Sequence, residues 1–192
     1  MSRPPRARGK VLDSARRIVR EEGASHLTFE RVAEKAGVTR AGVHYHYRSK
    51  QDLLEALLQA DIEAWDADCR ERADSDCAEA ACEVLGHVRT ALAQVDNPEL
   101  QGMAGILTAA AEDPGLLEVL RRHESKRFAD WRWDDADRER LLLMLAAEGA
   151  FWRAVFGIFP ERGGLAEDLL ARIESHLDGL EPSRGSESRS GS

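Results

Sequence analysis

The feature that most constrains the fold is a short segment in which two helix signals flank one tight glycine turn. It runs from Thr28 to Lys50 and reads TFERVAEKAGVTRAGVHYHYRSK. Thr28 is a typical N-cap residue, and Gly37 can end the first helix because glycine tolerates a positive φ. Thr39 then caps a second helix after only two turn residues. So short a connection forces the helices to cross steeply, which predicts a helix-turn-helix.

Apolar residues at helical spacing predict further helices on both sides of this segment. Before it, an apolar stripe starts near Lys10 and ends at Gly23, opposite a face that carries arginines. After it, Ser49 caps a long helix that extends to about Arg72. We therefore expect residues 10–48 to form a three-helix domain. Residues 1–9, which hold two prolines and three arginines, are expected to be a flexible basic arm.

The rest of the chain continues in the same helical pattern. Helices are predicted over residues 77–95, 99–111, 116–129, 136–159 and 165–180, with residues 113–115 as a turn, and no segment favours a strand. The helix at 136–159 is apolar on most sides, so we expect it to be buried on several of them. The fold class is therefore all-α, with the long helix joining the first domain to a helical bundle over residues 49–180. Residues 181–192 form a Ser/Gly/Arg tail that is predicted to be disordered.

The charge of the chain is divided unevenly along its length. The formal net charge is −8, yet residues 1–50 hold 12 Lys and Arg against 5 Asp and Glu. The remaining 142 residues hold 15 against 30. A basic N-terminal segment followed by an acidic remainder predicts phosphate binding at one end of the chain, with an affinity that falls steeply as salt rises. The alternative is that the arginines only form a solvated face.

Several classes of protein find little support in the sequence. No run approaches the ~20 apolar residues of a membrane span, and no apolar core follows the basic N-terminus, so we expect a cytoplasmic protein. GxSxG, P-loop and HExxH motifs are absent, which argues against an enzyme and against a cofactor. The spacing of Cys69, Cys77 and Cys82 is not that of a metal site, and reduced thiols are expected. A redox sensor or a disulfide across a dimer is the alternative.

The segment ARRIVREEGASHLTFERVAEKAGVTRAGVHYHYRSKQDLL resembles the DNA-binding domain of the TetR family of bacterial transcription regulators. The resemblance implies that the start of the second helix of the motif faces base edges of double-stranded DNA and that flanking residues hold the phosphate backbone. It implies repression as the usual outcome. Residues given a DNA contact are Thr28, Thr39, Arg40, Ala41, His44, Tyr45 and Lys50.

The chemistry of these side chains agrees with those roles. Arg40 can present a bidentate fork to guanine O6 and N7, which is worth about 1–3 kcal/mol of discrimination. Thr28 lies at a helix N-terminus, where a phosphate is favoured. His44 stands where the family commonly has tyrosine, and Tyr47 replaces the usual phenylalanine and is expected to fill the core with its hydroxyl at the rim. His44 and His46 project to different faces, so no metal site is predicted.

The resemblance also implies a homodimer that reads a palindromic operator and responds to a small-molecule effector. The predicted effector site combines thioethers, aromatic rings and a carboxylate in an apolar run, and is expected to take a largely hydrophobic molecule. Its residues are Met103, Leu107, Trp131, Met144, Glu148 and Trp152. The residues predicted for the dimer interface are Phe151, Val155, Leu165, Leu169, Ile173 and Leu177.

Glu148 is the sharpest residue of this set, because a carboxylate in an apolar helix needs a compensating charge. Arg153 or a cationic group on the effector is expected to supply that charge.

Two other interpretations of the function stay open: a helical protein-interaction module, and a redox-sensing regulator without a small-molecule ligand.

Overall fold

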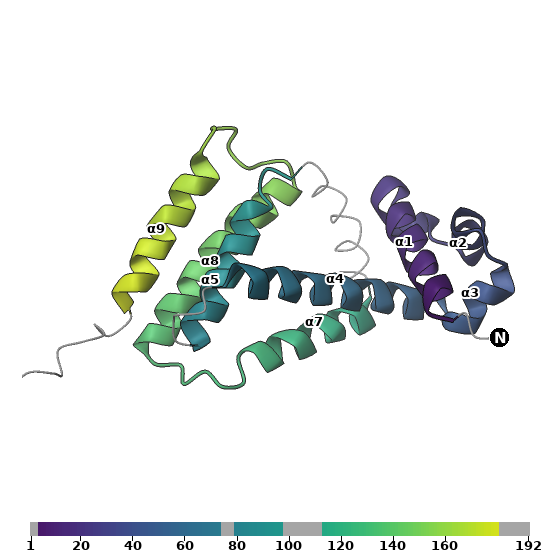
Figure 1. Ribbon diagram of the computed structural model, residues 1–192, viewed down its shortest axis with the longest axis horizontal. Helices are drawn as coiled ribbons and strands as arrows, with labels where there is room; N and C mark the ends of the chain where they lie inside the picture. The colour runs from purple at the N-terminus through teal and green to yellow at the C-terminus, as the bar shows by residue number, and fades with distance from the viewer. Residues whose placement is uncertain (1–3, 74–78, 98–112, 181–192) are drawn as a thin grey trace, which may run out of the picture. The chain divides into compact units, whose positions relative to one another are not determined.

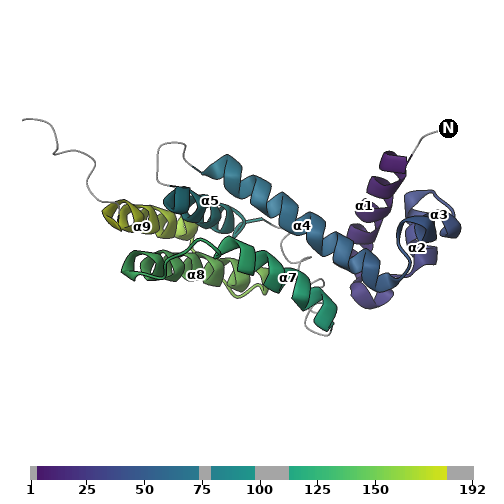
Figure 2. The same cartoon turned by 90° about the horizontal axis from the view of Figure 1, so that it is seen from below.

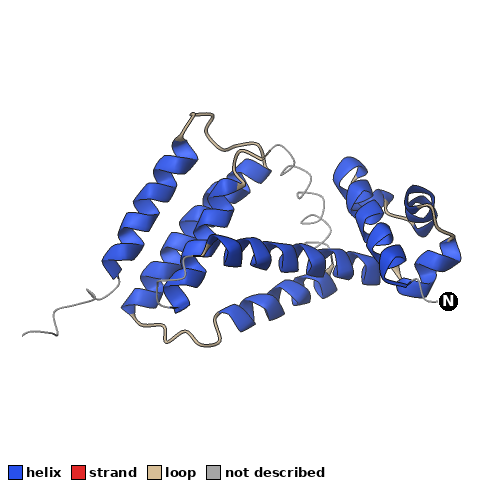
Figure 3. Ribbon diagram, in the orientation of Figure 1, coloured by secondary structure: helices blue, strands red, loops and turns tan. Residues whose placement is uncertain are grey.

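A computed structural model describes residues 4–73, 79–97 and 113–180 of the protein. Within these ranges the regular structure is helical and contains no strand, which confirms the all-α prediction (Figures 1 and 3). The helix predicted at 99–111 and the tail from 181 lie outside the described residues. The α-helices are α1 (Pro4–Glu22), α2 (Phe29–Ala36), α3 (Arg40–His46), α4 (Lys50–Arg72), α5 (Glu79–Ala93), α7 (Pro114–Arg127), α8 (Asp135–Val155) and α9 (Leu165–Leu180), and one 3₁₀-helix spans Ala24–His26.

The first helix begins earlier than the sequence predicted. α1 starts at Pro4, so the residues expected to form a flexible arm before Lys10 are helical from that point on. Proline is tolerated in the first turn of a helix because its missing N–H would have had no intrahelical partner there. The two prolines therefore mark a helix start, and the prediction of an arm over residues 1–9 is wrong from Pro4 onward.

The chain divides into two compact units, which we call the head and the body. Among the described residues, the head comprises 4–65, 97, 113–130 and 154–157, and the body comprises 66–73, 79–96, 131–153 and 158–180. The division falls inside α4 and groups α7 with the helix-turn-helix, unlike the predicted division at residue 48. Each unit is described by itself below.

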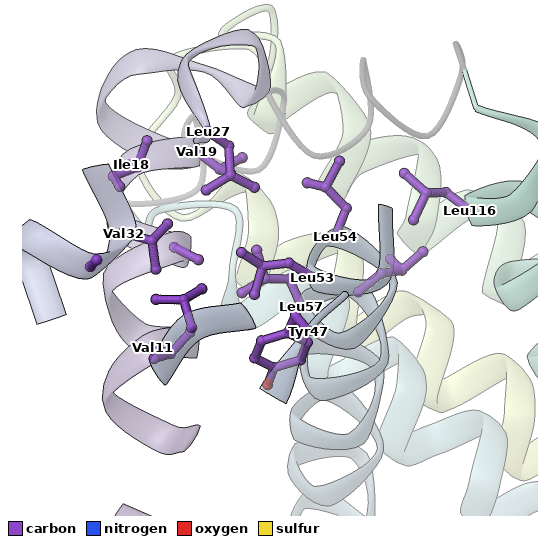
Figure 4. Packing of buried hydrophobic residues seen from close by; sticks show 14 of the residues in the cluster. Val11, Ile18, Val19, Leu27, Val32, Tyr47, Leu53, Leu54, Leu57 and Leu116 are labelled. Carbon is purple, nitrogen blue, oxygen red and sulfur yellow. The ribbon is translucent and has the colours of Figure 1, made fainter. Parts of the chain in front are cut away.

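The core of the head joins the first three helices to the start of α4 (Figure 4). Burying each of its valine, leucine and isoleucine side chains contributes about 1.5–3 kcal/mol, which makes this cluster the main support of the helix-turn-helix. Its members are Val11, Ala15, Ile18, Val19, Leu27, Val32, Ala33, Val43, Tyr47, Leu53, Leu54, Leu57, Leu58, Ile62 and Leu116.

The N-terminus of α7 packs onto the first turns of α4 and extends this core through Leu116. Asp113 caps α7 by accepting a hydrogen bond from the N–H of Gly115 at 2.8 Å, and Pro114 occupies the first turn. Gln51 of α4 lies so close that a side chain at Gly115 would overlap its amide. The sequence predicted a turn at residues 113–115, but these residues cap and open the helix.

The body is built from α5, α8 and α9, which run side by side (Figures 1 and 2). Arg89 of α5 donates from Nε to Glu174 of α9 at 2.7 Å and from Nη1 to the carbonyl oxygen of Arg72 at 3.0 Å. The buried apolar side chains of the body are Cys69, Ala81, Val84, Val88, Ala91, Leu92, Val95, Met144, Ala147, Ala150, Phe151, Ala166, Ile173 and Leu177.

Helix α8 ends at Val155, before the predicted end at Phe159. Gly157 adopts a φ of 66°, and the N–H of Ile158 reaches back to the carbonyl of Arg153 at 2.8 Å. A left-handed glycine just past the last turn satisfies carbonyls that the helix leaves free. The apolar run continues beyond the helix, so hydrophobicity alone overestimated its length.

The cysteines differ from the expectation of reduced thiols. Cys69 is buried and is not disulfide-bonded, whereas Cys82 is disulfide-bonded, and Cys77 lies outside the described residues. The prediction is therefore wrong for Cys82. A redox-sensing role stays a prediction. None of the helices in the described ranges is both long and apolar enough to cross a membrane.

Candidate nucleic-acid interface

The two helices of the motif begin and end at the predicted residues. Thr28 caps α2 by accepting from the N–H of Arg31 at 3.3 Å, and Thr39 caps α3 by accepting from the N–H of Gly42 at 3.0 Å. Gly37 ends α2 with a φ of 65°, which is the left-handed region. Each hydroxyl satisfies a backbone donor that the first turn leaves free, so the caps set where both helices start.

Two buried residues fix the rotation of α3. Val43 is fully buried, and Tyr47, just past the helix, is 4% exposed. The ring of Tyr47 belongs to the core of the head, while its hydroxyl accepts a hydrogen bond from Nε of Arg8 at 3.3 Å. This confirms the predicted placement of Tyr47. Because these residues hold one side of α3 against the core, the opposite side faces outward.

All seven residues predicted to contact DNA are exposed in the structure. They come from the N-caps of α2 and α3, from α3 itself and from the first residue of α4, and 82% of the surface of Tyr45 is exposed. The geometry therefore leaves them free to meet a large partner. In chain order they are Thr28, Thr39, Arg40, Ala41, His44, Tyr45 and Lys50.

His44 makes a contact that the sequence did not predict. Its ring lies edge-on to Phe29 of α2, with 5.7 Å between ring centroids. The ring of Tyr45 lies similarly against His46, at 5.2 Å. An edge-to-face pair holds a ring in one orientation, so both predicted contact side chains are steadied by aromatic neighbours.

Gly42 is explained by local geometry inside α3. Its N–H is the donor that the Thr39 hydroxyl caps, and an added Cβ would lie 3.3 Å from that same oxygen. A side chain there would press on the cap, so the small residue keeps the hydroxyl close to the backbone.

The start of α4 carries a reciprocal cap beside Lys50. Ser49 Oγ accepts from the N–H of Asp52 at 3.0 Å and donates to its Oδ1 at 2.6 Å. Asp52 Oδ2 also accepts from the N–H of Arg48 at 3.1 Å. The hydrogen bond from Ser49 is the main reason why the pKa of Asp52 lies below its ordinary value. The backbone from Arg48 to Lys50 is therefore held firmly where a phosphate contact is predicted.

Sequence reasoning missed one charged contact at the outer face of the motif. Nε of Arg40, the first residue of α3, lies 2.5 Å from Oε1 of Glu30 in the first turn of α2. Both side chains are largely exposed, at 65% and 63%. The pair depends on how the two helices cross, so helical periodicity within either helix carries no signal for it.

Comparison with known proteins agrees with this geometry. The family model described as "Bacterial regulatory proteins, tetR family" matches residues 11–57. The model described as "Tetracyclin repressor-like, C-terminal domain" matches residues 81–178, which is half of the chain. The chain belongs to the TetR family. The first match contains the helix-turn-helix and its caps, and the second extends from α5 to α9.

Curated TetR-family relatives align with part of the chain. The HTH-type transcriptional regulator TtgR of Pseudomonas putida is 32% identical over 90 residues, which are 47% of this chain and 41% of TtgR. The tetracycline repressor protein class A from transposon 1721 of Escherichia coli is 33% identical over 66 residues, or 34% of this chain and 31% of that protein. The chain thus aligns with less than half the length of these relatives.

Solved structures of the TetR family share the fold over nearly the whole chain. A TetR transcription regulator from Haloarcula marismortui has a TM-score of 0.67 at 20% identity and covers 90% of this chain and 97% of its own. The regulator SCO4454 from Streptomyces coelicolor has a TM-score of 0.67 at 20% identity, covering 91% and 96%. At these identities the likeness concerns the fold alone.

The residues that were predicted to bind an effector in this TetR-family chain lie in different environments. Met103 and Leu107 lie outside the described residues. Met144 is buried in the body, while Trp131 and Trp152 are half-buried, and their rings contact Trp133 and Phe151 respectively. These contacts place two of the predicted lining residues in aromatic pairs of the body.

Glu148 has a partner other than the two that were expected. A carboxylate oxygen accepts, so the Nε2–H of His87 on α5 donates to Glu148 Oε1, at 2.8 Å. His87 is buried, whereas Glu148 is half-buried. Arg153 instead donates to the carbonyl of Ile158 at 3.3 Å. The prediction that Arg153 compensates the charge of Glu148 is therefore wrong. A cationic ligand is not needed to explain a carboxylate at this position, because His87 is its hydrogen-bond partner.

The structure also corrects the residues predicted to form the dimer interface. Phe151, Val155, Ile173 and Leu177 are at most 7% exposed within one subunit, so they pack inside it. Leu165 and Leu169 of α9 are half-buried. The large apolar residues of α8 that are exposed are Leu142 and Leu145, which lie on the other side of the helix from the core. An apolar helix has no polar face to indicate which of its sides is covered.

Proposed function

We propose that the protein is a DNA-binding transcriptional regulator that acts as a repressor and is released from its operator by a small molecule. The observation that carries this proposal is the exposed start of α3, where Thr39, Arg40 and Ala41 lie outward from a helix anchored by Val43. A helix N-terminus presented in this way is the part of a helix-turn-helix that enters a major groove. Family membership supports the same role.

The side chains divide into two kinds of contact. Arg40 reads a guanine through its donor fork, and Thr39 and Ala41 meet a thymine methyl or a phosphate. Tyr45 and Lys50 hold the backbone on one side of α3, and Thr28 offers the N-terminus of α2 on the other. The base contact supplies specificity, while the backbone contacts supply affinity that weakens as salt rises.

We propose that two copies pair through an exposed apolar face of α8. Leu142 is 59% exposed and Leu145 is 53% exposed, and one turn further on Gly149 leaves open space at its Cβ position. A homodimer would cover this face with the same face of a second copy. Two recognition helices about 34 Å apart then read a palindromic operator, because that spacing is one turn of the duplex.

The effector is proposed to be a largely hydrophobic molecule that binds the body. Support comes from the half-buried aromatic side chains Trp131 and Trp152 and from the extent of apolar surface on α8. The effector acts by preferring a subunit arrangement in which the two heads no longer match the operator. Because His87 already satisfies Glu148, the proposal includes no basic group on the effector.

The test is fluorescence anisotropy of the full chain with the intergenic DNA upstream of its own gene, at increasing salt. The regulator should bind this DNA more tightly than an unrelated duplex, with a steep negative slope of affinity against salt. Absent or salt-insensitive binding would exclude the proposal in favour of a protein-interaction module.

Two substitutions separate the proposed contacts. Arg40→Ala should relax the preference for one base pair in each half-site by about 5- to 150-fold. Lys50→Ala should weaken all sequences alike and reduce the salt slope by about 1 for each protomer. The same effect from both substitutions would contradict the division between base and backbone contacts.

A further inference from the structure

We propose that Glu30 is a positioning residue for the recognition of DNA, because it orients the guanidinium of Arg40. This inference rests on the proposed function of Arg40 as a base reader. Its basis is the ion pair between Oε1 of Glu30 and Nε of Arg40, 2.5 Å apart, which links the first turns of α2 and α3.

The inference depends on which atom of the Arg40 guanidinium lies beside Glu30, and that atom is Nε. A guanidinium has five N–H donors, one on Nε and four on the two Nη atoms. With Oε1 of Glu30 beside Nε, the edge formed by Nη1 and Nη2 remains a parallel pair of donors. That edge matches the O6 and N7 acceptors of guanine in the major groove. Glu30 thus lies on the Nε side of the guanidinium and leaves the edge formed by Nη1 and Nη2 for the base.

The pair is poorly placed to serve stability. Both side chains are more than 60% exposed, and ion pairs at such sites contribute little to the free energy of unfolding. A carboxylate is also unfavourable beside a phosphate backbone, so its position works against general DNA affinity. Glu30 offsets this disadvantage by restricting the long, flexible side chain of Arg40 before DNA binds. Less conformational entropy is then lost when the base contact forms.

Glu34 provides a matched control on the same helix. It is an exposed glutamate of α2, and the ion pair with Arg40 is made by Glu30, one helical turn earlier. Glu34→Ala removes the same charge from α2 and leaves the Glu30–Arg40 pair intact. Any effect that arises only from reduced repulsion of DNA should therefore appear in both variants.

The experiment begins with wild-type protein and a pool of random-sequence duplexes, from which the preferred sequence is enriched. The base pair read by Arg40 is the one at which Arg40→Ala loses discrimination. Affinities are then measured for the enriched duplex, for duplexes changed at that pair, and for an unrelated duplex. The proteins are wild type, Glu30→Ala, Glu30→Gln, Glu34→Ala, Arg40→Ala and the Glu30→Ala/Arg40→Ala double variant.

We expect Glu30→Ala to lower discrimination at the Arg40 base pair by about three- to tenfold, while binding to the unrelated duplex stays equal or rises. Glu30→Gln keeps an acceptor oxygen and should retain more of the discrimination than Glu30→Ala. In the Arg40→Ala background, loss of Glu30 should change discrimination no further. Glu34→Ala should raise affinity for all duplexes alike and leave discrimination unchanged.

Two results would overturn the role of Glu30: unchanged discrimination in Glu30→Ala, or a loss that persists without Arg40, which would make Glu30 a base reader itself. If wild-type protein enriches no sequence, or Arg40→Ala keeps full discrimination, the base contact of Arg40 fails first and the inference falls with it. Thermal unfolding of each variant shows whether the fold is retained, which the exposure of both side chains predicts.

Discussion

Arg16 of α1 donates from both Nε and Nη2 to Oδ1 of Asp61 on α4, at 3.0 and 2.8 Å. The two side chains are 30% and 24% exposed, so this pair is partly shielded from water. It links the first helix of the head to the long helix that follows the helix-turn-helix. Charge-assisted hydrogen bonds with two donors are stronger and more directional than single ones.

Asp61→Ala should lower the free energy of unfolding by about 1–2 kcal/mol, since it leaves a half-buried guanidinium without its main acceptor. Asp13→Ala is the matched control, because Asp13 contacts the same arginine at 3.4 Å but is 73% exposed. That variant should change stability by less than about 0.5 kcal/mol. Urea denaturation at fixed protein concentration measures both, and equal losses would refute a special role for Asp61.

Gly86→Ala should destabilise the body, although alanine is usually the better helix former. A Cβ at Gly86 of α5 would overlap the carbonyl oxygen of Cys69, which is backbone and cannot rotate away. We expect a loss of about 1–3 kcal/mol in the free energy of unfolding.

Gly9→Ala in α1 is the control for this substitution, because nothing lies near its Cβ position in the described structure. It should raise helix stability by about 0.5–1 kcal/mol. Thermal unfolding of both variants, followed by circular dichroism, tests the contrast. A gain in both would mean that α4 and α5 separate easily at Gly86.

The cap at the start of α4 should make the free energy of unfolding depend on pH in the acidic range. The pKa of Asp52 is lowered in the folded state, mainly by the hydrogen bond from Ser49. Its stabilising contribution is therefore complete above the unfolded-state pKa of about 3.9 and is lost as the pH falls through the lower folded-state value.

Ser49→Ala removes the main cause of that shift, so the folded-state pKa of Asp52 should rise toward its ordinary value. The acid-dependent part of the unfolding free energy should shrink with it. NMR titration of the Asp52 carboxyl in both proteins measures the change. An unmoved pKa would assign the shift to the backbone N–H groups of Arg48 and Ser49, the smaller causes.

The proposed dimer face predicts the effect of a charge on α8. Leu145→Glu places a carboxylate where two copies would meet, and burial of an unpaired charge opposes association. We expect monomers by sedimentation velocity at concentrations where the wild-type protein forms dimers. Ser25→Glu adds the same charge to an exposed residue of the head and should leave the dimer intact. A persistent dimer in Leu145→Glu would show that another face of the subunit is used.

Much of the head could be predicted from the sequence because its signals are local. The hydroxyls of Thr28 and Thr39 bond to backbone groups three residues away, and Gly37 responds to the φ of its own residue. The resemblance of the segment to a known family added the roles of the exposed side chains. The prolines at the N-terminus misled the prediction, since Pro4 opens a helix instead of preventing one.

Contacts between helices could not be predicted, because helical periodicity describes one helix at a time. The pairing of Glu30 with Arg40 and of His87 with Glu148 depends on how two helices cross. On α8, Phe151 is buried whereas Leu145 is exposed, although both are large apolar residues in the same apolar run.

The sequence by itself thus determined that the chain is helical, where α2, α3 and α4 are capped, and which residues form the motif, because those depend on neighbours along the chain. Only the tertiary structure decided the partner of each charged side chain and the side of α8 that stays open. Both depend on which helix packs against which face, and many packings are compatible with one apolar pattern.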